Sequence, residues 1–236
     1  MGWWLLVIFI VLILWIIYSA WPTFWTRVCK HSMQTTGLPD TVSLTFDDGP
    51  NPVYTPRLLD ELKAQDIKAT FFVLSERAQE YREIVERMLE EGHDVQVHGS
   101  RHWFVPLLHP FAARMQCVGA ARALQASFCV TPHVYRPTWG AANLASLFFV
   151  RRSGMRLCTW NVMVGDWRNT EPEELVRRIV GKLENQSIIV LHDSDHTFGA
   201  ETGAPENVIR AIPAISEAVR SRGLRFVRIC DCLGES

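Results

Sequence analysis

The first 26 residues carry no charged side chain, and this feature constrains the fold of the chain more than any other. Trp3 to Trp21 reads WWLLVIFIVLILWIIYSAW, in which Ser19 is the one clearly polar side chain. As a helix, this stretch would span about 29 Å, close to the ~30 Å hydrocarbon core of a bilayer. Pro22 predicts the end of that helix. A buried helix of a soluble domain usually keeps a polar stripe, so we expect residues 1–26 to form a transmembrane anchor.

A cleaved signal peptide is the alternative interpretation of this segment. It would need a cationic start, a shorter apolar stretch and a small-x-small cleavage site, and only a weak YSA sequence is present. Aromatic rings that favour the headgroup region flank the apolar stretch at Trp3, Trp4, Tyr18, Trp21 and Trp25. We therefore predict a single-pass protein of the cell (plasma or inner) membrane, bound to the lipid bilayer through this helix.

The side of the membrane on which the remaining chain lies stays open. Arg27 and Lys30 follow the apolar stretch, and the positive-inside rule then favours a cytoplasmic domain. Five later cysteines favour the same reducing compartment: Cys117, Cys129, Cys158, Cys230 and Cys232. Large domains can cross a membrane regardless of two flanking charges, so these signals do not decide the orientation.

The charged residues all lie after the apolar stretch, in about 210 residues that suffice for one core. The formal net charge of −1 argues against a nucleic-acid partner, because no excess of cations exists to neutralise phosphates. None of the six cysteines forms a C-x-x-C pair, so no zinc-ribbon pattern is present. The sequence identifies no protein partner.

We predict a polar linker at 27–40, followed by one α/β domain at 41–236. Strand-like stretches are expected at 41–46, 69–73, 94–97, 133–136, 156–160, 187–191 and 224–229. Helical patterns lie between them near 55–65, 75–92, 111–126, 171–184 and 205–222, the last interrupted by Pro213. This alternation predicts a mainly parallel sheet, and the length suits a distorted, reduced (β/α) barrel of about seven strands.

Polar side chains that can do chemistry stand at the ends of these predicted strands. Because active sites of parallel α/β folds form where strands end, we expect the following residues to meet: Asp47, Asp48, His98, Arg136, Asp166 and His192. Packing in a core does not account for six polar residues at such positions.

The first two motifs are TFDDGP at 45–50 and HGSRH at 98–102. By itself, Asp-Asp-Gly-Pro could be a polar surface turn, and an isolated H-x-x-x-H pair is weak evidence. His98 and His102 are four residues apart, so on one helical turn both imidazoles can converge on a metal ion. Together with Asp48 they form a two-histidine, one-carboxylate set, which suits zinc-dependent hydrolysis or non-haem iron.

The remaining motifs are YRPTWG at 135–140, GDW at 165–167 and VLHD at 190–193. Arg136 could hold Asp47 by a bidentate contact, and Asp166 could orient His192, as acids commonly orient catalytic histidines. Standing alone, His192 could be a packed histidine, and Trp139 and Trp167 could be core aromatics.

In this order the five motifs resemble the polysaccharide deacetylases of the NodB-homology type, carbohydrate esterase family 4. The resemblance runs from Thr45 to Asp193, and KATFF at 68–72 also fits. It implies a distorted (β/α) barrel and the metal-dependent removal of an acyl group from the amide nitrogen of a sugar. The metal implied is divalent, with Zn²⁺ as the first candidate and Co²⁺, Ni²⁺ and Mn²⁺ as alternatives.

Roles carried over from the family fall on individual residues of this chain. The resemblance implies Asp47 as catalytic base, Arg136 as its holder, and Asp166 with His192 as the acid pair. It implies the metal ligands Asp48, His98 and His102, and substrate contacts from Trp139, Leu191 and Trp167. Trp139 stands where a tyrosine commonly lends its backbone N–H to the oxyanion, and Leu191 matches the wall of the acyl pocket.

Three positions depart from the family pattern. Gly99 replaces the usual Ser or Thr after the first metal histidine, which removes a hydrogen bond in the loop. Thr138 and Trp139 replace the usual Pro-Tyr, and Met163 stands where many members carry an additional acid. None of these changes removes a group that performs chemistry.

We therefore predict a membrane-anchored, metal-dependent carbohydrate N-deacetylase. The anchor keeps the site near the lipid, which favours a lipid-linked amino sugar or a surface glycan as substrate. Three alternatives stay open: a deformylase of a polyprenyl-linked formamido sugar, a catalytically inactive glycan-binding module, and a non-haem iron oxygenase. The last would require neither Asp47 nor His192.

Overall fold

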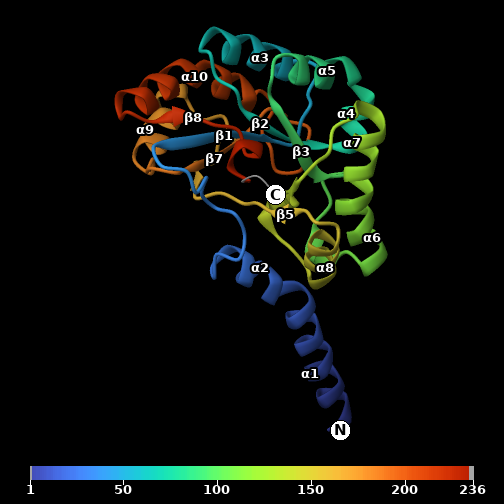
Figure 1. Ribbon diagram of the computed structural model, residues 1–236. Helices are drawn as coiled ribbons and strands as arrows, with labels where there is room; N and C mark the ends of the chain where they lie inside the picture. The colour runs from blue at the N-terminus through green and yellow to red at the C-terminus, as the bar shows by residue number, and fades with distance from the viewer. Residues whose placement is uncertain (1, 234–236) are drawn as a thin grey trace.

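The computed structural model describes residues 2–233, and within them a parallel sheet forms the centre of the molecule (Figure 1). The strands follow the order β5-β4-β3-β2-β1-β7-β6, and β8 pairs with β1 beside this path. The path is open from β5 to β6, so the sheet forms an incomplete barrel. The strands are β1 (Thr41–Asp47), β2 (Thr70–Leu74), β3 (Asp94–Gly99), β4 (Val134–Tyr135), β5 (Arg156–Leu157), β6 (Val162–Met163), β7 (Ile188–His192) and β8 (Arg225–Phe226).

Helices cover the sheet and pack amphipathic faces on it. They are α3 (Tyr54–Ala64), α4 (Ser75–Glu80), α5 (Arg82–Glu90), α6 (Pro110–Arg114), α7 (Ala120–Phe128), α8 (Leu144–Arg152), α9 (Pro172–Val180) and α10 (Ala204–Ser221). Short turns occur at η2 (Val105–Leu107), η4 (Thr138–Gly140) and η5 (Cys230–Cys232), and η3 (Met115–Gly119) is a π-helical turn between α6 and α7. Every residue of β1 is buried, as expected for a central strand covered on both faces.

The predicted fold class is confirmed, and each of the seven predicted strands is present in whole or in part. Sequence reasoning missed the two-residue strand β6 and helix α8, because β6 is too short to show a period and α8 is apolar on most sides. The helix expected from Ser75 to Gly92 is broken at Tyr81, whose φ of −113° and ψ of 53° are not helical. Pro213 lies inside the continuous helix α10.

The N-terminal helix runs from Trp3 to Arg27 and is long and apolar enough to cross a membrane. It consists of α1 (Trp3–Trp15), the π-helical turn η1 (Ile16–Ala20) and α2 (Trp21–Arg27). Our expectation that Pro22 ends the helix is wrong. In η1 the N–H of Trp21 bonds to the carbonyl of Ile16, five residues earlier, so the helical hydrogen bonds are already in the wider π pattern when the chain reaches Pro22, which has no N–H to donate. The helix can therefore continue to Arg27.

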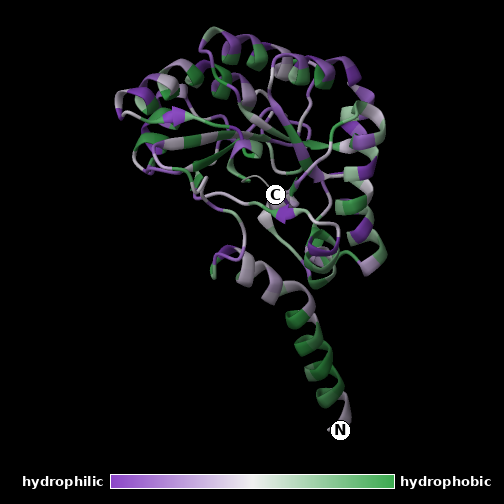
Figure 2. Ribbon diagram, in the orientation of Figure 1, coloured by the Kyte–Doolittle hydropathy of each residue, from purple (hydrophilic) through white to green (hydrophobic). Residues whose placement is uncertain are grey.

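The last part of this helix packs on the body of the domain. Tyr18 Oη donates a hydrogen bond to the carbonyl of Leu108 (2.7 Å), and Ser19 Oγ donates to that of Pro106 (2.7 Å). Thr23 Oγ1 donates to the carbonyl of Ala142 (2.9 Å). In contrast, α1 projects away from the domain and exposes apolar side chains along its length (Figure 2). The helix therefore has a free apolar part and a part that belongs to the domain surface.

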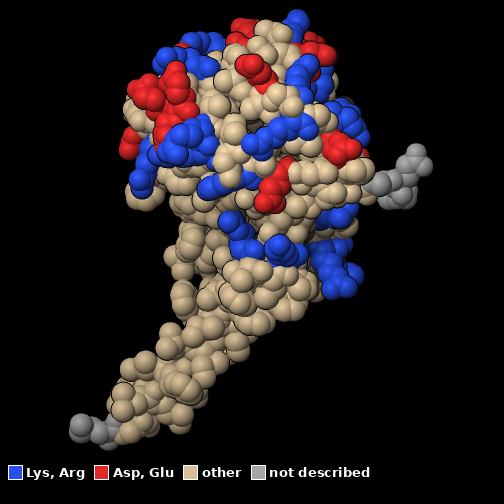
Figure 3. All heavy atoms as spheres, turned by 90° about the vertical axis from the view of Figure 1, so that its left-hand side faces the viewer, with Lys and Arg blue, Asp and Glu red and all other residues tan. Residues whose placement is uncertain are grey.

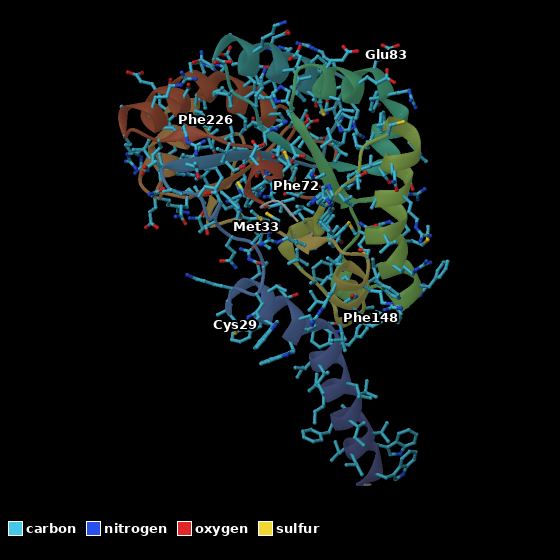
Figure 4. The ribbon with its side chains drawn as sticks, viewed as in Figure 1. Cys29, Met33, Phe72, Glu83, Phe148 and Phe226 are labelled. Carbon is cyan, nitrogen blue, oxygen red and sulfur yellow. The ribbon has the colours of Figure 1, made fainter. Side chains whose placement is uncertain are left out.

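Residues 27–40 lead from this helix to β1 along the body. The N–H of Met33 bonds to the carbonyl of Leu157 (2.8 Å), and that of Thr36 bonds to the carbonyl of Gln186 (2.9 Å). Figure 4 shows Cys29 beside α2 and Met33 higher up, where the chain has reached the domain. These contacts attach the connection to β5 and to the turn before β7 rather than leaving it free.

Candidate active site

The site begins at the carboxyl end of β1, where Asp47 and Asp48 follow each other. Asp48 has a φ of 78°, so the chain turns sharply and the two carboxylates serve different partners. In the register of the sheet, Asp47 lies opposite His192 at the end of β7. The carboxyl ends of β1 and β7 therefore bring two of the predicted catalytic residues to the same edge.

Asp47 forms a buried ion pair with Arg136. The distance from Arg136 Nη1 to Asp47 Oδ1 is 2.7 Å, and the two side chains are 0% and 3% exposed. The same Nη1 donates to Thr45 Oγ1 (2.7 Å), and Nη2 donates to the carbonyl of Thr159 (3.1 Å). The guanidinium also stacks on Phe72 at 3.8 Å from the ring centroid. The predicted pairing is present, though through a single nitrogen, and it fixes the orientation of the Asp47 carboxylate.

Asp48, His98 and His102 converge in space as predicted. Asp48 Oδ1 lies 3.1 Å from His98 Nε2 and 3.3 Å from His102 Nε2. The three ligand atoms lie within 4.8 Å of one another. Zinc ligands at about 2.0–2.2 Å from a common ion would be separated by distances of this size.

The hydrogen bonds of the histidines fit a cation at this point. His98 Nδ1 lies 2.8 Å from the carbonyl of Arg136, which can only accept, so Nδ1 carries the proton. In neutral His98 the lone pair of Nε2 then faces Asp48 Oδ1, which is buried without a hydrogen-bond partner. Burial lowers the pKa of His102, which favours the neutral form that binds metals. Two acceptors at 3.1 Å are stabilised by a shared cation, so these residues fit a divalent metal.

Our expectation that one helical turn brings the two histidines together is wrong. His98 belongs to β3, and His102 follows in an irregular loop. Gln116 of η3 holds this loop: its Oε1 accepts from Ser100 Oγ (2.7 Å), and its Nε2 donates to the carbonyl of Arg101. A Cβ on residue 99 would overlap Gln116, so the glycine at this departure from the family pattern leaves room for the glutamine.

His192 and Asp166 form the second predicted pair. His192 Nδ1 lies 3.1 Å from Asp166 Oδ2, and the backbone N–H of His192 donates to the same oxygen (2.7 Å). Burial alone would lower the pKa of His192, but the charge and hydrogen bond of Asp166, with the charges of Asp48 and Asp47, raise it to about 10. An imidazolium at the end of β7 can therefore serve as a proton donor.

One cavity of about 540 Å³ joins these groups. Seven of the ten predicted site residues line it: Asp47, Asp48, His98, His102, Trp139, Trp167 and His192. Arg136 and Asp166 lie behind the cavity wall and act through Asp47 and His192. Leu191 is fully buried in the main core and does not line the cavity.

Aromatic rings form the rim of the cavity. Trp139 packs edge-on against His102, with 4.5 Å between the ring centroids, and it remains 43% exposed. Its φ of 54° lies in the left-handed region, and the neighbouring Gly140 of η4 also lines the cavity. Trp167 packs edge-on against His192 at 5.7 Å. Both tryptophans therefore contribute aromatic surface to the cavity.

Four residues near the site were not found by sequence reasoning. Thr197 Oγ1 donates to Asp48 Oδ2 (2.8 Å), and Gln116 holds the loop between the histidines. Arg27 and Trp160 line the cavity from α2 and from the segment after β5. Trp160 ends the strand predicted at 156–160, so its place at a strand end was the signal that could have found it. No strand end or motif marks the other three positions, which tertiary packing brings to the site.

Comparisons with known proteins agree with this geometry. The family model for polysaccharide deacetylase matches residues 34–158. A peptidoglycan-N-acetylglucosamine deacetylase of Bacillus cereus is 28% identical over 80% of this chain, and the match spans 66% of that relative's length. A chitooligosaccharide deacetylase of Sinorhizobium fredii is 30% identical, covering 80% of this chain and 89% of that one. The crystal structure of a peptidoglycan N-acetylglucosamine deacetylase has a TM-score of 0.81 at 26% identity, covering 90% of this chain and 97% of that one.

Proposed function

The chain belongs to the polysaccharide deacetylase family, and we propose from this premise that it removes an acyl group from the amide nitrogen of an amino sugar. One observation carries the proposal: Asp47, the cluster of Asp48, His98 and His102, and His192 all line a single cavity. A base, a candidate metal site and an acid are the groups that amide hydrolysis needs.

Asp48, His98 and His102 would hold a divalent ion, for which Zn²⁺ is the first candidate. When bound, such an ion supplies Lewis acidity, which lowers the pKa of water and polarises the acyl carbonyl. Thr197 orients one oxygen of Asp48, and the carbonyl of Arg136 orients the His98 ring. These contacts fix the ligands before the ion binds.

The proton transfers fall to the chain's own residues. Asp47, held by Arg136, accepts a proton from the water that attacks the amide carbonyl. The backbone N–H of Trp139 donates to the oxyanion, a contact of a kind that contributes about 3–4 kcal/mol. His192, kept protonated by Asp166, gives its proton to the leaving nitrogen as the C–N bond breaks. The products are a carboxylic acid and an amino sugar.

The alternatives differ in what they require of these residues. An iron oxygenase would need the metal cluster but neither Asp47 nor His192, and a glycan-binding module would need none of the proton-transfer groups. A deformylase would use the same residues on a smaller acyl group. The relatives named above are deacetylases, so acetyl is the acyl group that we propose first.

We also propose that the N-terminal helix anchors the enzyme in the cell membrane. The exposed stretch Trp3–Ile17 would span about 22 Å, which is shorter than the ~30 Å hydrocarbon core. Around the helix exit, four exposed side chains form an apolar collar: Leu107 (68%), Phe111 (65%), Leu144 (49%) and Phe148 (59%). Phe148 lies at the end of the domain from which the helix projects (Figure 4). If this collar enters the membrane, its side chains would extend the apolar surface beyond the helix and make up the difference from the thickness of the hydrocarbon core.

The charge distribution supports the same arrangement. In Figure 3 the projecting part of the helix shows no charged side chain, and Lys and Arg gather at the end of the domain beside it, where no acidic group is visible in this view. Such a distribution suits the anionic headgroups of a membrane surface. Because the cavity is lined by Thr23 of the same helix, a lipid-linked amino sugar could reach it from the bilayer.

The proposal is tested by incubating the full chain in lipid nanodiscs with a panel of N-acyl sugars. The panel holds a polyprenyl-linked N-acetyl sugar, its formamido counterpart, N-acetylchitooligosaccharides and peptidoglycan fragments. Mass spectrometry reads the loss of acetyl or formyl, and metal analysis identifies the ion. We expect loss of acetyl, abolished by a chelator and restored by Zn²⁺.

Matched histidine variants serve as controls in this assay. His192→Ala removes the proposed acid, whereas His133→Ala removes an exposed histidine outside the cavity. We expect the first to lose turnover and the second to retain it. Sugar binding without acyl release from any substrate, with metal bound, would favour the inactive module and overturn the proposed activity.

A further inference from the structure

Arg27 brings a cationic side chain into the cavity from the membrane-proximal helix. It is the last residue of α2 and the first charged residue of the chain. Its side chain is half-buried and lines the cavity together with Thr23 of the same helix. Thr23 bonds to Ala142, which fixes this end of the helix against the domain. The position of Arg27 is therefore set by the docked helix.

The guanidinium of Arg27 has no anionic partner among residues 2–233. It stacks on Trp160, with 4.2 Å from Cζ to the ring centroid, and its contacts in the described chain include no ion pair. A Cβ on residue 140 would overlap both Arg27 and Trp160, so Gly140 makes room for the stack. A half-buried guanidinium that lines a cavity and has no anionic partner among the described residues is suited to binding an anion there.

Trp160 connects Arg27 to the arginine that holds Asp47. Trp160 stacks on Arg27 at 4.2 Å and lies 5.7 Å from the guanidinium of Arg136, which holds Asp47. The two guanidinium carbons therefore lie no more than about 10 Å apart. A pyranose ring with its substituents can bridge a separation of up to this size, so a sugar whose amide lies at Asp47 can place another substituent near Arg27.

We propose that Arg27 binds a phosphate group carried by the amino sugar that the enzyme deacylates. The inference rests on the proposed function and narrows its substrate class to sugar phosphates joined to a membrane lipid. A guanidinium binds phosphate oxygens through paired N–H donors, which neither Thr23 nor the aromatic rim can supply.

The location of Arg27 favours phosphate over the carboxylate of a polymeric glycan. The helix that carries it exposes Trp21 (50%), Phe24 (47%) and Trp25 (38%), side chains that prefer the headgroup region of a bilayer. Phosphate is the anion that a lipid-linked sugar carries at this depth. A carboxylate-bearing polymer would approach from the aqueous side, away from the helix.

Direct binding of inorganic pyrophosphate tests the subsite without any reaction. The probe is titrated into the metal-loaded full chain in nanodiscs of neutral lipid, by calorimetry, for wild type, Arg27→Gln, Arg27→Lys and Arg152→Gln. Arg152 is an exposed arginine on α8 that does not line the cavity. We expect binding to weaken about tenfold or more in Arg27→Gln, to be largely kept in Arg27→Lys, and to be unchanged in Arg152→Gln. Equal binding by wild type and Arg27→Gln overturns the proposal.

A kinetic comparison then separates this inference from the proposed function. The kcat/KM values are measured for a phosphorylated N-acetyl sugar and for its neutral methyl glycoside. We expect Arg27→Gln to lose about tenfold or more on the first and less than about threefold on the second. Equal losses on both substrates overturn the phosphate assignment while deacylation stands. Arg27-dependent pyrophosphate binding without acyl release from any sugar keeps the subsite and overturns the activity.

Two further arms identify the source of the anion. Acetate replaces pyrophosphate in the titration, and an Arg27 dependence for acetate alone would assign a carboxylate and contradict the proposal. The pyrophosphate titration is also repeated in nanodiscs containing phosphatidylglycerol. If this lipid does not compete, the phosphate belongs to the substrate as proposed; competition that removes the pyrophosphate signal assigns Arg27 to membrane headgroups and contradicts a substrate role.

Discussion

The two walls of the cavity are built in different ways. One wall consists of strand ends, where Asp47 ends β1 and Asp48 follows it, His98 is the next-to-last residue of β3, and His192 ends β7. The other wall consists of a docked helix and loops, with Arg27 from α2 and Thr197 from the loop after β7. The first wall carries the proposed base, the proposed acid and two of the three metal ligands. His102 and Trp139 complete the metal site and the oxyanion contact from loops beside it. The second wall carries groups that we assign to orientation and substrate choice.

This difference indicates which groups of the site the sheet fixes and which can change independently of it. A strand end in a parallel sheet is fixed by its neighbours on both sides, so the groups there keep their relative positions. A helix such as α2, outside the sheet, can be changed without moving these groups. Substitutions on the first wall should therefore remove turnover, whereas those on the second should change metal binding or substrate preference.

The largest effect is expected from the metal ligands on the strand-end wall. His98→Ala removes one of three ligands and leaves Asp48 Oδ1 with a single histidine partner. We expect the variant to lose bound metal and to fall below detectable turnover, because the cavity then lacks its Lewis acid. Metal analysis of the purified chain and an acetate-release assay measure both losses. Turnover without metal in this variant would contradict the role assigned to the cluster.

The next effect concerns the acid pair on the same wall. His192→Ala should keep its metal and lose about 10²–10⁴-fold in kcat, the usual contribution of a general acid. Because Asp166 raises the pKa of His192 above the ordinary value of about 6.5, the wild type should stay active at pH values above 6.5. In Asp166→Asn the loss of activity with rising pH should begin at lower pH. A pH–rate profile measures this shift, and an unchanged alkaline limb would show that His192 is not the proton donor.

The free energy of unfolding should also depend on the protonation of His192, and it should fall as the pH rises. The pKa of histidine in an unfolded chain is about 6.5, so between pH 6.5 and 10 the folded state binds a proton that the unfolded state lacks. This contribution to the free energy of unfolding is complete below about pH 6.5 and is lost as the pH rises toward 10. Denaturant titrations at pH 7 and pH 10 measure the free energy of unfolding of the wild type and of His192→Ala. The wild type should lose more of it between these pH values than the variant does.

The contrast between the walls also explains how much the sequence could predict. The order of strands and the strand-end residues follow from local patterns, since each polar group directly follows an apolar run such as SIIVL before His192. Short strand β6 and the break at Tyr81 have no such pattern. Arg27 lies 20 residues before Asp47 and reaches the cavity only because Tyr18, Ser19 and Thr23 dock their helix on the domain. Neither the hydrophobic periodicity of the sequence nor the spacing of its motifs predicts that docking.

A smaller effect is expected from Gln116, which holds the loop that connects His98 at the strand end to His102. Gln116→Leu keeps the volume but removes the bonds to Ser100 and Arg101, which hold the loop between His98 and His102. We expect metal affinity to fall about 10–100-fold, as is usual for groups that orient metal ligands, while kcat at saturating metal changes much less. Gln116→Glu keeps the acceptor for Ser100 and should lose less affinity. Metal titrations followed by activity at saturating metal measure both quantities, and a loss of kcat that excess metal does not restore would contradict the assigned role.

The smallest effect is expected from Thr197 on the loop wall. Thr197→Val keeps the shape of the side chain and removes the hydrogen bond to Asp48 Oδ2, the oxygen that does not face the histidines. A single hydrogen bond of this kind contributes about 0.5–1.5 kcal/mol, so metal affinity should fall roughly two- to tenfold. Thr197→Ser keeps the hydroxyl and should retain the affinity of the wild type. If Thr197→Val instead abolishes turnover at saturating metal, the loop wall takes part in the reaction itself, and the division between the two walls does not hold.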